Sequence, residues 1–144
     1  MMYKFRTMIV NAESLKRGLD RRNERSAILF KVSDDPRVTR IGRFLRKYSL
    51  DEIPQLINIL RGEMSLVGPR PPLAAEVEQY HPQHFIRLKV LPGLTGLWQI
   101  NARRSPSFHD YIKFDTLYVQ NMSFWLDIKI LVRTIGVVLA GTGE

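Results

Sequence analysis

The sequence predicts a helix-rich mixed α/β fold with a small sheet, folded as a single domain over residues 1–144. The chain has 144 residues, of which 44% are hydrophobic and 25% charged, a composition typical of one folded domain. Apolar residues recur at helical spacing in several segments, whereas strand signals are few. The helices predicted at 37–48 and 123–140 are amphipathic, as are helices that lie on a membrane surface.

The first third of the chain contains a predicted strand, a polar segment and a basic helix. Residues 3–10 alternate enough for a strand, and 11–26 are polar enough for a surface helix or a loop. The Asp35–Pro36 step predicts a turn. Residues 37–48 repeat apolar side chains at steps of three or four. The apolar residues are Val38, Ile41, Phe44, Leu45 and Tyr48, and the opposite basic stripe consists of Arg37, Arg40, Arg43 and Arg46.

A second helix is predicted to begin at Ser49. Ser49 is a favourable N-cap, and Glu52 three residues later completes a capping box. Pro54 is tolerated in a first turn, and Gly62 ends the helix. The remaining elements are predicted as an apolar, then rigid loop (64–72), a helix interrupted at Pro82 (73–89), a turn and strand (91–100), and two closing helices (107–120 and 123–140).

The charge balance restricts the class of partner. The formal net charge of +8 indicates an anionic partner: nucleic acid, a phospholipid surface or a phosphorylated substrate. The absence of cysteine excludes disulfides and cysteine metal sites. Neither a GxGxxG nor a GxxxxGK[ST] pattern is present, so no Rossmann or P-loop nucleotide site is indicated. The apolar stretch 124–140 is interrupted by three charged residues and is too short for a typical membrane span.

Two adjacent acids, Asp51 and Glu52, follow the basic stripe. The structural interpretation is a capping box for Glu52 and a favourable helix-dipole position for Asp51. The chemical interpretation is a nucleophile or a metal site, because a carboxylate can attack phosphorus. Such an attack brings two anions together and requires arginine or Mg²⁺ nearby. Arg46 and Arg70, the latter held between prolines, are candidate phosphate ligands.

Four blocks of the sequence carry a resemblance to a known family. They are YKFRTM (3–8), DPRVTRIGRFLRKYSLDEIPQLINILRGEMSLVGPRPP (35–72), PGLTGLWQINAR (92–103) and DTLYVQNMSFWLDIKILVRT (115–134). In these blocks the chain resembles the bacterial sugar transferases, also called monotopic phosphoglycosyl transferases. The blocks cover most of the chain in family order, and the second is long and specific.

The resemblance implies transfer of a sugar-1-phosphate from a UDP-sugar to undecaprenyl phosphate, with release of UMP. This reaction would be the first step of exopolysaccharide, capsule, O-antigen or glycoconjugate synthesis. Asp51 would be the nucleophile that forms a covalent phosphosugar intermediate, and Glu52 would assist Mg²⁺ placement or acceptor deprotonation. Arg46 would hold a phosphate, and Arg70 and Arg103 would bind the substrate. Glucose, galactose and N-acetylated or diamino sugars all agree with this pattern.

The resemblance also implies a location at the cytoplasmic face of the bacterial inner membrane, on an anionic surface. The family carries an apolar membrane-penetrating helix ahead of the KFRTM motif, so we expect 1–144 to be an N-terminally truncated catalytic region. Two rival hypotheses are an inactive membrane-surface scaffold and a basic nucleic-acid-binding module. The second lacks any recognisable nucleic-acid motif, so we expect no nucleic-acid partner. A homo-oligomer is left open.

Overall fold

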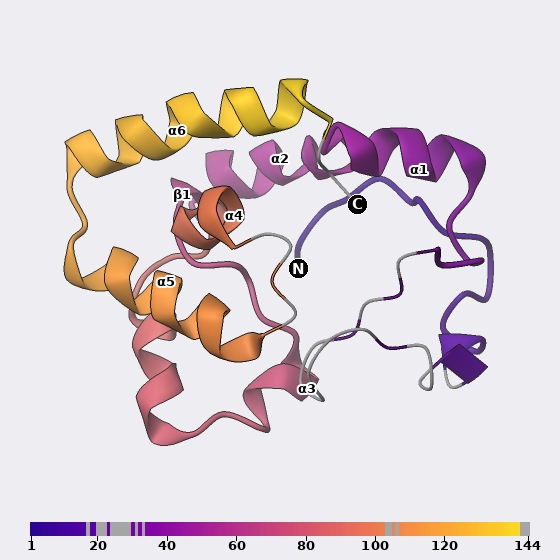
Figure 1. Cartoon of the computed structure of the whole chain (residues 1–144), viewed down its shortest axis with the longest axis horizontal. Coiled ribbons are helices and arrows are strands. Elements are labelled where there is room, and N and C mark those ends of the chain that lie inside the picture. Colours follow the sequence, from indigo (N-terminus) through magenta and orange to yellow (C-terminus); the bar gives the residue numbers. More distant parts are fainter. Residues whose placement is uncertain are drawn as a thin grey trace.

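This computed structural model describes residues 1–16, 18–19, 23, 30, 32, 34–102, 105 and 107–141. In chain order the elements, with η marking 3₁₀ helices, are α1 (Arg40–Lys47), η2 (Leu50–Glu52), α2 (Gln55–Leu60), β1 (Ser65–Val67), α3 (Ala74–Val77), η3 (Pro82–Lys89), β2 (Gly93–Thr95), α4 (Leu97–Asn101), α5 (Phe108–Gln120) and α6 (Phe124–Leu139). Helices predominate and one sheet of two strands is present among the described residues (Figure 1). The predicted helix-rich mixed fold is confirmed.

The sheet consists of β1 and β2, which pair in parallel. The register aligns Ser65 with Gly93 and Val67 with Thr95. The prediction of a strand within 91–100 is confirmed. The segment 64–72 was predicted as apolar and then loop-like, and β1 lies in its apolar part. The sequence did not predict β1 because a three-residue strand is too short to display an alternating pattern. Just beyond β1, the backbone at Gly68 lies very close to β2. A Cβ on Gly93 would lie 2.0 Å from the backbone nitrogen of Gly68.

Helices α5 and α6 form the core together with the sheet. Tyr118 of α5, Ile130 of α6 and Val67 of β1 pack together and are almost fully buried. The hydroxyl of Tyr118 donates to Oδ1 of Asp127 at 2.9 Å and lies 3.1 Å from the carbonyl oxygen of Val67. The helices predicted at 107–120 and 123–140 are confirmed, each within one residue at either end.

Helix α1 confirms most of the helix predicted at 37–48. It begins at Arg40 because Thr39 caps it, and Oγ1 of Thr39 accepts a hydrogen bond from the Gly42 nitrogen at 2.9 Å. Arg37 does not belong to the basic stripe. It is 4% exposed, and its Nη2 lies 2.6 Å from Oδ2 of Asp35 in the predicted turn.

The predicted capping box at Ser49 and Glu52 is wrong. Ser49 has a left-handed backbone (φ 55°) and makes no side-chain capping bond, whereas an N-cap residue requires an extended backbone. The chain instead forms η2 over Leu50–Glu52, and α2 begins only at Gln55. The Glu52 carboxylate pairs with Lys4, which lies far away in the sequence.

The strand predicted at 3–10 is also wrong. Only Met8 forms a bridge, antiparallel to Val38, and the segment otherwise lies beside α1 and η2 without regular secondary structure. The backbone nitrogens of Phe5 and Ile9 donate to the carbonyl oxygens of Asp51 and Arg37, and neither acceptor belongs to a strand of the described residues. Of the segment 11–26, residues 11–15 lie in turns and most of the remainder lies outside the described residues.

The middle of the chain departs from its prediction in detail. The helix predicted at 73–89 divides into α3 and η3, and the second begins at Pro82, where a break was expected. A helix, α4, follows β2 where the sequence predicted continuing strand. Gly96, extended at φ −168°, precedes α4 and separates it from β2.

Helices α1, α2 and α6 run along one long edge of the molecule, and α5, η3 and α3 occupy the opposite side (Figure 1). The chain just after α6 lies against the end of α1. A Cβ on Gly141 would lie 3.0 Å from Cε of Lys47. Within the described ranges, no helix is long and apolar enough to cross a membrane.

Candidate active site

The N-terminal segment lies against the acid pair that joins α1 to α2. The backbone nitrogen of Phe5 donates to the carbonyl oxygen of Asp51 at 3.0 Å. One residue earlier, Nζ of Lys4 lies 2.7 Å from Oε1 of Glu52. The backbone nitrogen of Tyr3 donates to Oδ1 of the buried Asn58 at 3.0 Å. These contacts fix Lys4 opposite the acid pair.

Thr7 and Gly42 explain why this segment lies so close to α1. A Cβ on Gly42 would lie 2.0 Å from the carbonyl oxygen of Thr7, so any larger residue would push the segment away. That carbonyl also accepts a bond from the Thr39 nitrogen at 3.0 Å. The Thr7 hydroxyl in turn accepts a bond from Nε of Arg46 at 2.9 Å. Arg46 is therefore oriented by a residue 39 positions away.

The Asp51 carboxyl group belongs to a buried residue, which is 9% exposed. Burial raises the pKa of Asp51 above its usual value, because a carboxylate loses its hydration there. The charges of Lys4 and Arg46 lower this pKa, and the charge of Glu52 raises it, with a net upward shift. Within the described part of the chain Asp51 is in no ion pair, whereas Glu52 is held by Lys4.

The structure brings three of the five predicted site residues together. Asp51, Glu52 and Arg46 interact electrostatically at the junction of α1 and η2. Arg70 belongs to a different cluster, because its Nη2 lies 3.8 Å from Oε1 of Glu76. The fifth predicted residue, Arg103, lies outside the described residues.

Sequence reasoning missed Lys4 and Thr7 as members of this site. Both occur in the block YKFRTM, which marks the family but gives no spacing that relates it to Asp51. Lys4 and Glu52 are 48 positions apart, and only tertiary structure joins them. The sequence contained one signal that this segment could belong to a site. It has three polar residues close together, Lys4, Arg6 and Thr7, in a segment that otherwise alternates.

The acid pair has the chemistry of a partial magnesium site. In the described part of the chain no group of three or more His, Cys, Asp or Glu residues converges on one point. Mg²⁺ in proteins is commonly held by one or two carboxylates, water and the phosphates of a substrate. Asp51 and Glu52 supply two adjacent carboxylates, so they fit an ion that is shared with a phosphate ligand.

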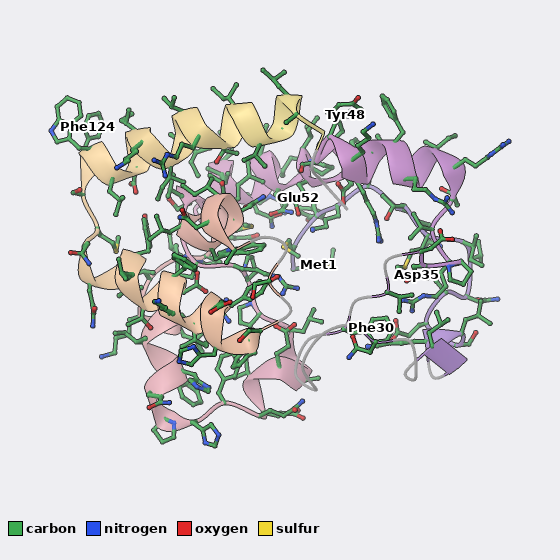
Figure 2. The ribbon with its side chains drawn as sticks, viewed as in Figure 1. Met1, Phe30, Asp35, Tyr48, Glu52 and Phe124 are labelled. Atoms are coloured by element: carbon green, nitrogen blue, oxygen red, sulfur yellow. The ribbon has the colours of Figure 1, made fainter. Side chains whose placement is uncertain are left out.

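A surface groove of about 720 Å³ lies between η3 and α5. Its walls include Phe85, Ile112 and Leu117, with Lys89 and Lys113 also lining it. None of the four predicted site residues that the structure describes lines it: Arg46, Asp51, Glu52 and Arg70. The acid pair itself lies at the opposite, α1–α2 side, where Glu52 lies further into the molecule than Tyr48 (Figure 2).

Comparison with known proteins identifies the family. Residues 1–141 match the Bacterial sugar transferase family, and the chain belongs to that family. The chain is 49% identical to the Galactosyl transferase CpsE of Streptococcus agalactiae serotype III over 98% of its own length and 32% of that protein. It is 48% identical to a UDP-galactose-lipid carrier transferase of Erwinia amylovora, over 97% of this chain and 30% of that protein.

A third relative is the Undecaprenyl-phosphate galactose phosphotransferase of Salmonella typhimurium, which is 43% identical over 98% of this chain and 30% of that protein. The chain therefore spans about a third of the length of these three relatives. The resemblance expected from the four sequence blocks is confirmed at the level of the family.

Proposed function

We propose that the chain is the catalytic region of an enzyme that transfers a sugar-1-phosphate from a UDP-sugar to undecaprenyl phosphate. The names of two relatives support the donor and acceptor classes: one contains UDP-galactose and a lipid carrier, the other undecaprenyl phosphate. The observation that carries the proposal is the buried Asp51, which has no ion-pair partner among the described residues and lies beside the Glu52–Lys4 pair and Arg46.

In the proposed first step, an ionised carboxylate oxygen of Asp51 attacks the phosphorus that bears the sugar. The bond from that phosphorus to the UMP oxygen breaks, and UMP leaves with the electron pair. This gives an aspartyl phosphosugar. Burial makes the Asp51 carboxylate poorly hydrated, which favours attack, and Lys4 and Arg46 offset the repulsion between the two anions.

In the proposed second step, a phosphate oxygen of undecaprenyl phosphate attacks the same phosphorus. The bond to Asp51 breaks, the carboxylate is regenerated, and a sugar-diphosphate lipid forms. Glu52 assists deprotonation of the acceptor or the placement of a metal ion. Arg46, whose Nε is held by Thr7, directs its remaining guanidinium nitrogens to a phosphate.

Asp51 and Glu52 would hold Mg²⁺ together with the donor's phosphates. When bound, the ion neutralises the negative charge that collects between the carboxylate and the diphosphate. We propose that Arg70 and Arg103 bind the nucleotide-sugar, the first from its stiff loop between Pro69 and Pro71.

We propose that α1, α2 and α6 hold this site at the cytoplasmic face of the bacterial inner membrane. Large apolar side chains are exposed on all three helices: Ile41, Phe44, Leu56, Ile57, Leu60, Phe124, Trp125, Val132, Ile135 and Leu139. Phe124 projects outward at one end of α6, and Tyr48 lies near its other end (Figure 2). The net charge of +8 favours an anionic leaflet.

Intact-protein mass spectrometry tests the proposal. The chain is incubated with Mg²⁺ and a panel of UDP-sugars, without lipid acceptor, beside Asp51→Asn. We expect a mass increase of one sugar phosphate on the parent chain only, for one or a few donors, with stoichiometric UMP. The matched control is Asp34→Asn, because Asp34 is an exposed acid that pairs with Arg43 at 3.4 Å and with none of the predicted site residues that the structure describes. An adduct that persists in Asp51→Asn would exclude Asp51 as the nucleophile.

If the parent forms no adduct, the experiment is repeated with an N-terminal membrane segment from a family member fused ahead of Met1. An adduct in the fusion would support the chemistry and show that this chain needs a membrane segment for it. Failure of both proteins with every donor would contradict the proposal, and vesicle binding without turnover would then favour the scaffold hypothesis.

A further inference from the structure

Arg87 and Asp115 form an ion pair that the proposed chemistry does not use. Nη2 of Arg87 lies 2.6 Å from Oδ2 of Asp115, and the two side chains are 3% and 1% exposed. Nε of Arg87 and Oδ1 of Asp115 have no hydrogen-bond partner among the described residues. Removing two charges from water at incompletely bonded positions is unfavourable. Stability alone therefore does not account for this pair.

Arg87 extends from the pair to the loop that carries Arg70. Its Nη2 donates to the carbonyl oxygen of Arg70 at 2.8 Å, across 17 positions of sequence. Its Nη1 donates to the hydroxyl of Tyr80 at 2.7 Å. The guanidinium thus connects α5, through Asp115, to the backbone of the loop.

The side chain of Arg70 is held from the other direction. Its Nη2 lies 3.8 Å from Oε1 of Glu76, which is itself 5% exposed. The other oxygen of Glu76 accepts a bond from the Leu73 nitrogen at 3.0 Å, so the acid is fixed to the loop. The Arg70 side chain remains 32% exposed. The guanidinium of Arg70 is therefore paired with an acid of the protein and is still partly accessible to a ligand.

We propose that Arg87 and Asp115 are positioning residues that hold the backbone of Arg70, so that its guanidinium is presented to the UDP-sugar in a fixed direction. This inference rests on the proposed function, in which Arg70 binds the donor. A preoriented guanidinium loses less conformational entropy when it binds a phosphate or a uracil oxygen. The pair acts through Arg70 and does not touch the reacting atoms.

A double-mutant cycle tests whether the pair acts through Arg70. Arg87→Lys keeps a charge beside Asp115 but lacks the fork of donors that reaches both Arg70 and Tyr80. We expect it to raise KM for the UDP-sugar about tenfold, as for the loss of one well-placed hydrogen bond to a charged group, with little change in kcat. In the Arg70→Ala background the same change should have no further effect. Equal fold-changes in both backgrounds would overturn the inference.

Two further variants separate positioning from general damage to the core. Asp115→Asn removes the charge that holds Arg87, and at pH 8, where Asp115 is ionised, it should raise KM as Arg87→Lys does. Tyr80→Phe is the matched control, because it removes one bond of the same guanidinium and leaves the bond to the Arg70 carbonyl. We expect Tyr80→Phe to keep the parent KM. An increase in KM equal to that of Arg87→Lys would indicate a merely structural role and overturn the inference.

Hydrogen exchange distinguishes failure of this inference from failure of the proposed function. Exchange of the Gly68, Arg70 and Leu73 amides, which are the amides of 68–73 that carry a hydrogen, is compared in the unliganded parent, Arg87→Lys, Asp115→Asn and Tyr80→Phe. We expect faster exchange in the first two variants only. If the parent transfers no sugar phosphate but exchange follows this order, the proposed function is contradicted. The inference that Arg87 and Asp115 fix the Arg70 loop is then still supported. Exchange equal to the parent in both variants overturns the inference, whatever the activity.

Discussion

Nζ of Lys4 lies 2.7 Å from Oε1 of Glu52, although 48 positions separate the two residues. This contact places a cation beside two adjacent carboxylates and lowers the pKa of Asp51, which burial otherwise raises. Lys4 therefore increases the fraction of Asp51 that is ionised at a given pH.

Lys4→Met should slow formation of the sugar-phosphate adduct and move its pH dependence upward. Without the cation, burial and the charge of Glu52 raise the pKa of Asp51 further, so the ionised nucleophile forms only at higher pH. The rate of adduct formation measured from pH 4 to pH 9 gives the midpoint. Lys16→Met is the control, because Lys16 also pairs with an acid, Glu13 at 3.8 Å, but not with the site. An unchanged midpoint in Lys4→Met would contradict this account.

Asp51→Asn should abolish the adduct and yet stabilise the fold. A raised pKa means that the folded state disfavours the charged carboxylate, so a neutral amide removes a cost that is present at pH 7. We expect the free energy of unfolding to increase by about 1 kcal/mol, a common gain when a functional site is neutralised. Urea unfolding at pH 7 measures it, with the exposed Asp34→Asn as the control. A loss of stability would show that Asp51 has a structural role.

The free energy of unfolding should fall as the pH rises from about 4 to 7, with Asp115 as a principal cause. Burial raises the pKa of Asp115 to about 7, against the charges of Arg87 and Arg70. In this window the folded state holds a proton that the unfolded state releases, so stability is lost by at most about 1.4 kcal/mol per pH unit from this group. Urea unfolding at several pH values should show a smaller slope in Asp115→Asn. An identical slope would remove Asp115 as the cause.

Gly93→Ala should destabilise the protein by about 3 kcal/mol or more, as overpacking against a rigid backbone does. The new methyl group would lie 2.0 Å from the backbone nitrogen of Gly68, just before the Arg70 loop. Gly136→Ala is the control, because Gly136 lies within α6 and no described atom outside the backbone of that helix lies within 4 Å of an added Cβ. That change should stabilise by roughly 0.5–1 kcal/mol through helix propensity. Thermal unfolding of the two variants gives opposite shifts if the packing is correct.

Replacing Ile41 and Phe44 together by serine should weaken binding to anionic vesicles by on the order of 100-fold or more, since each apolar side chain transferred from water contributes about 1.5–3 kcal/mol. Both are more than half exposed, so the fold should be retained. Flotation with anionic and zwitterionic vesicles at two salt concentrations measures the effect. Leu73→Ser is the control, because Leu73 is as exposed as Phe44, at 56%, but directly precedes α3. Equal loss in the control would show that α1 does not define the membrane-facing surface.

Local patterns in the sequence were sufficient to predict the long helices and to identify the family. The periodicity of 37–48, 107–120 and 123–140 predicts α1, α5 and α6, because an amphipathic helix repeats within its own turns. The block around Asp51 and Glu52 indicates the acid pair and Arg46 as candidates without any three-dimensional information. The roles of these residues stay predictions that the adduct experiment tests.

Contacts between distant segments were decided only by the tertiary structure. The prediction of a capping box at Ser49 was wrong because the Glu52 carboxylate pairs with Lys4. The prediction of a strand at 3–10 was wrong because the segment lies beside α1 and η2. Arg37 is not part of the basic stripe, because its side chain pairs with Asp35 in a turn. Likewise, nothing in the spacing of Arg70, Arg87 and Asp115 relates them to one another. Sequence patterns report which face of an element is apolar, whereas the partner of a buried charge depends on how the elements pack.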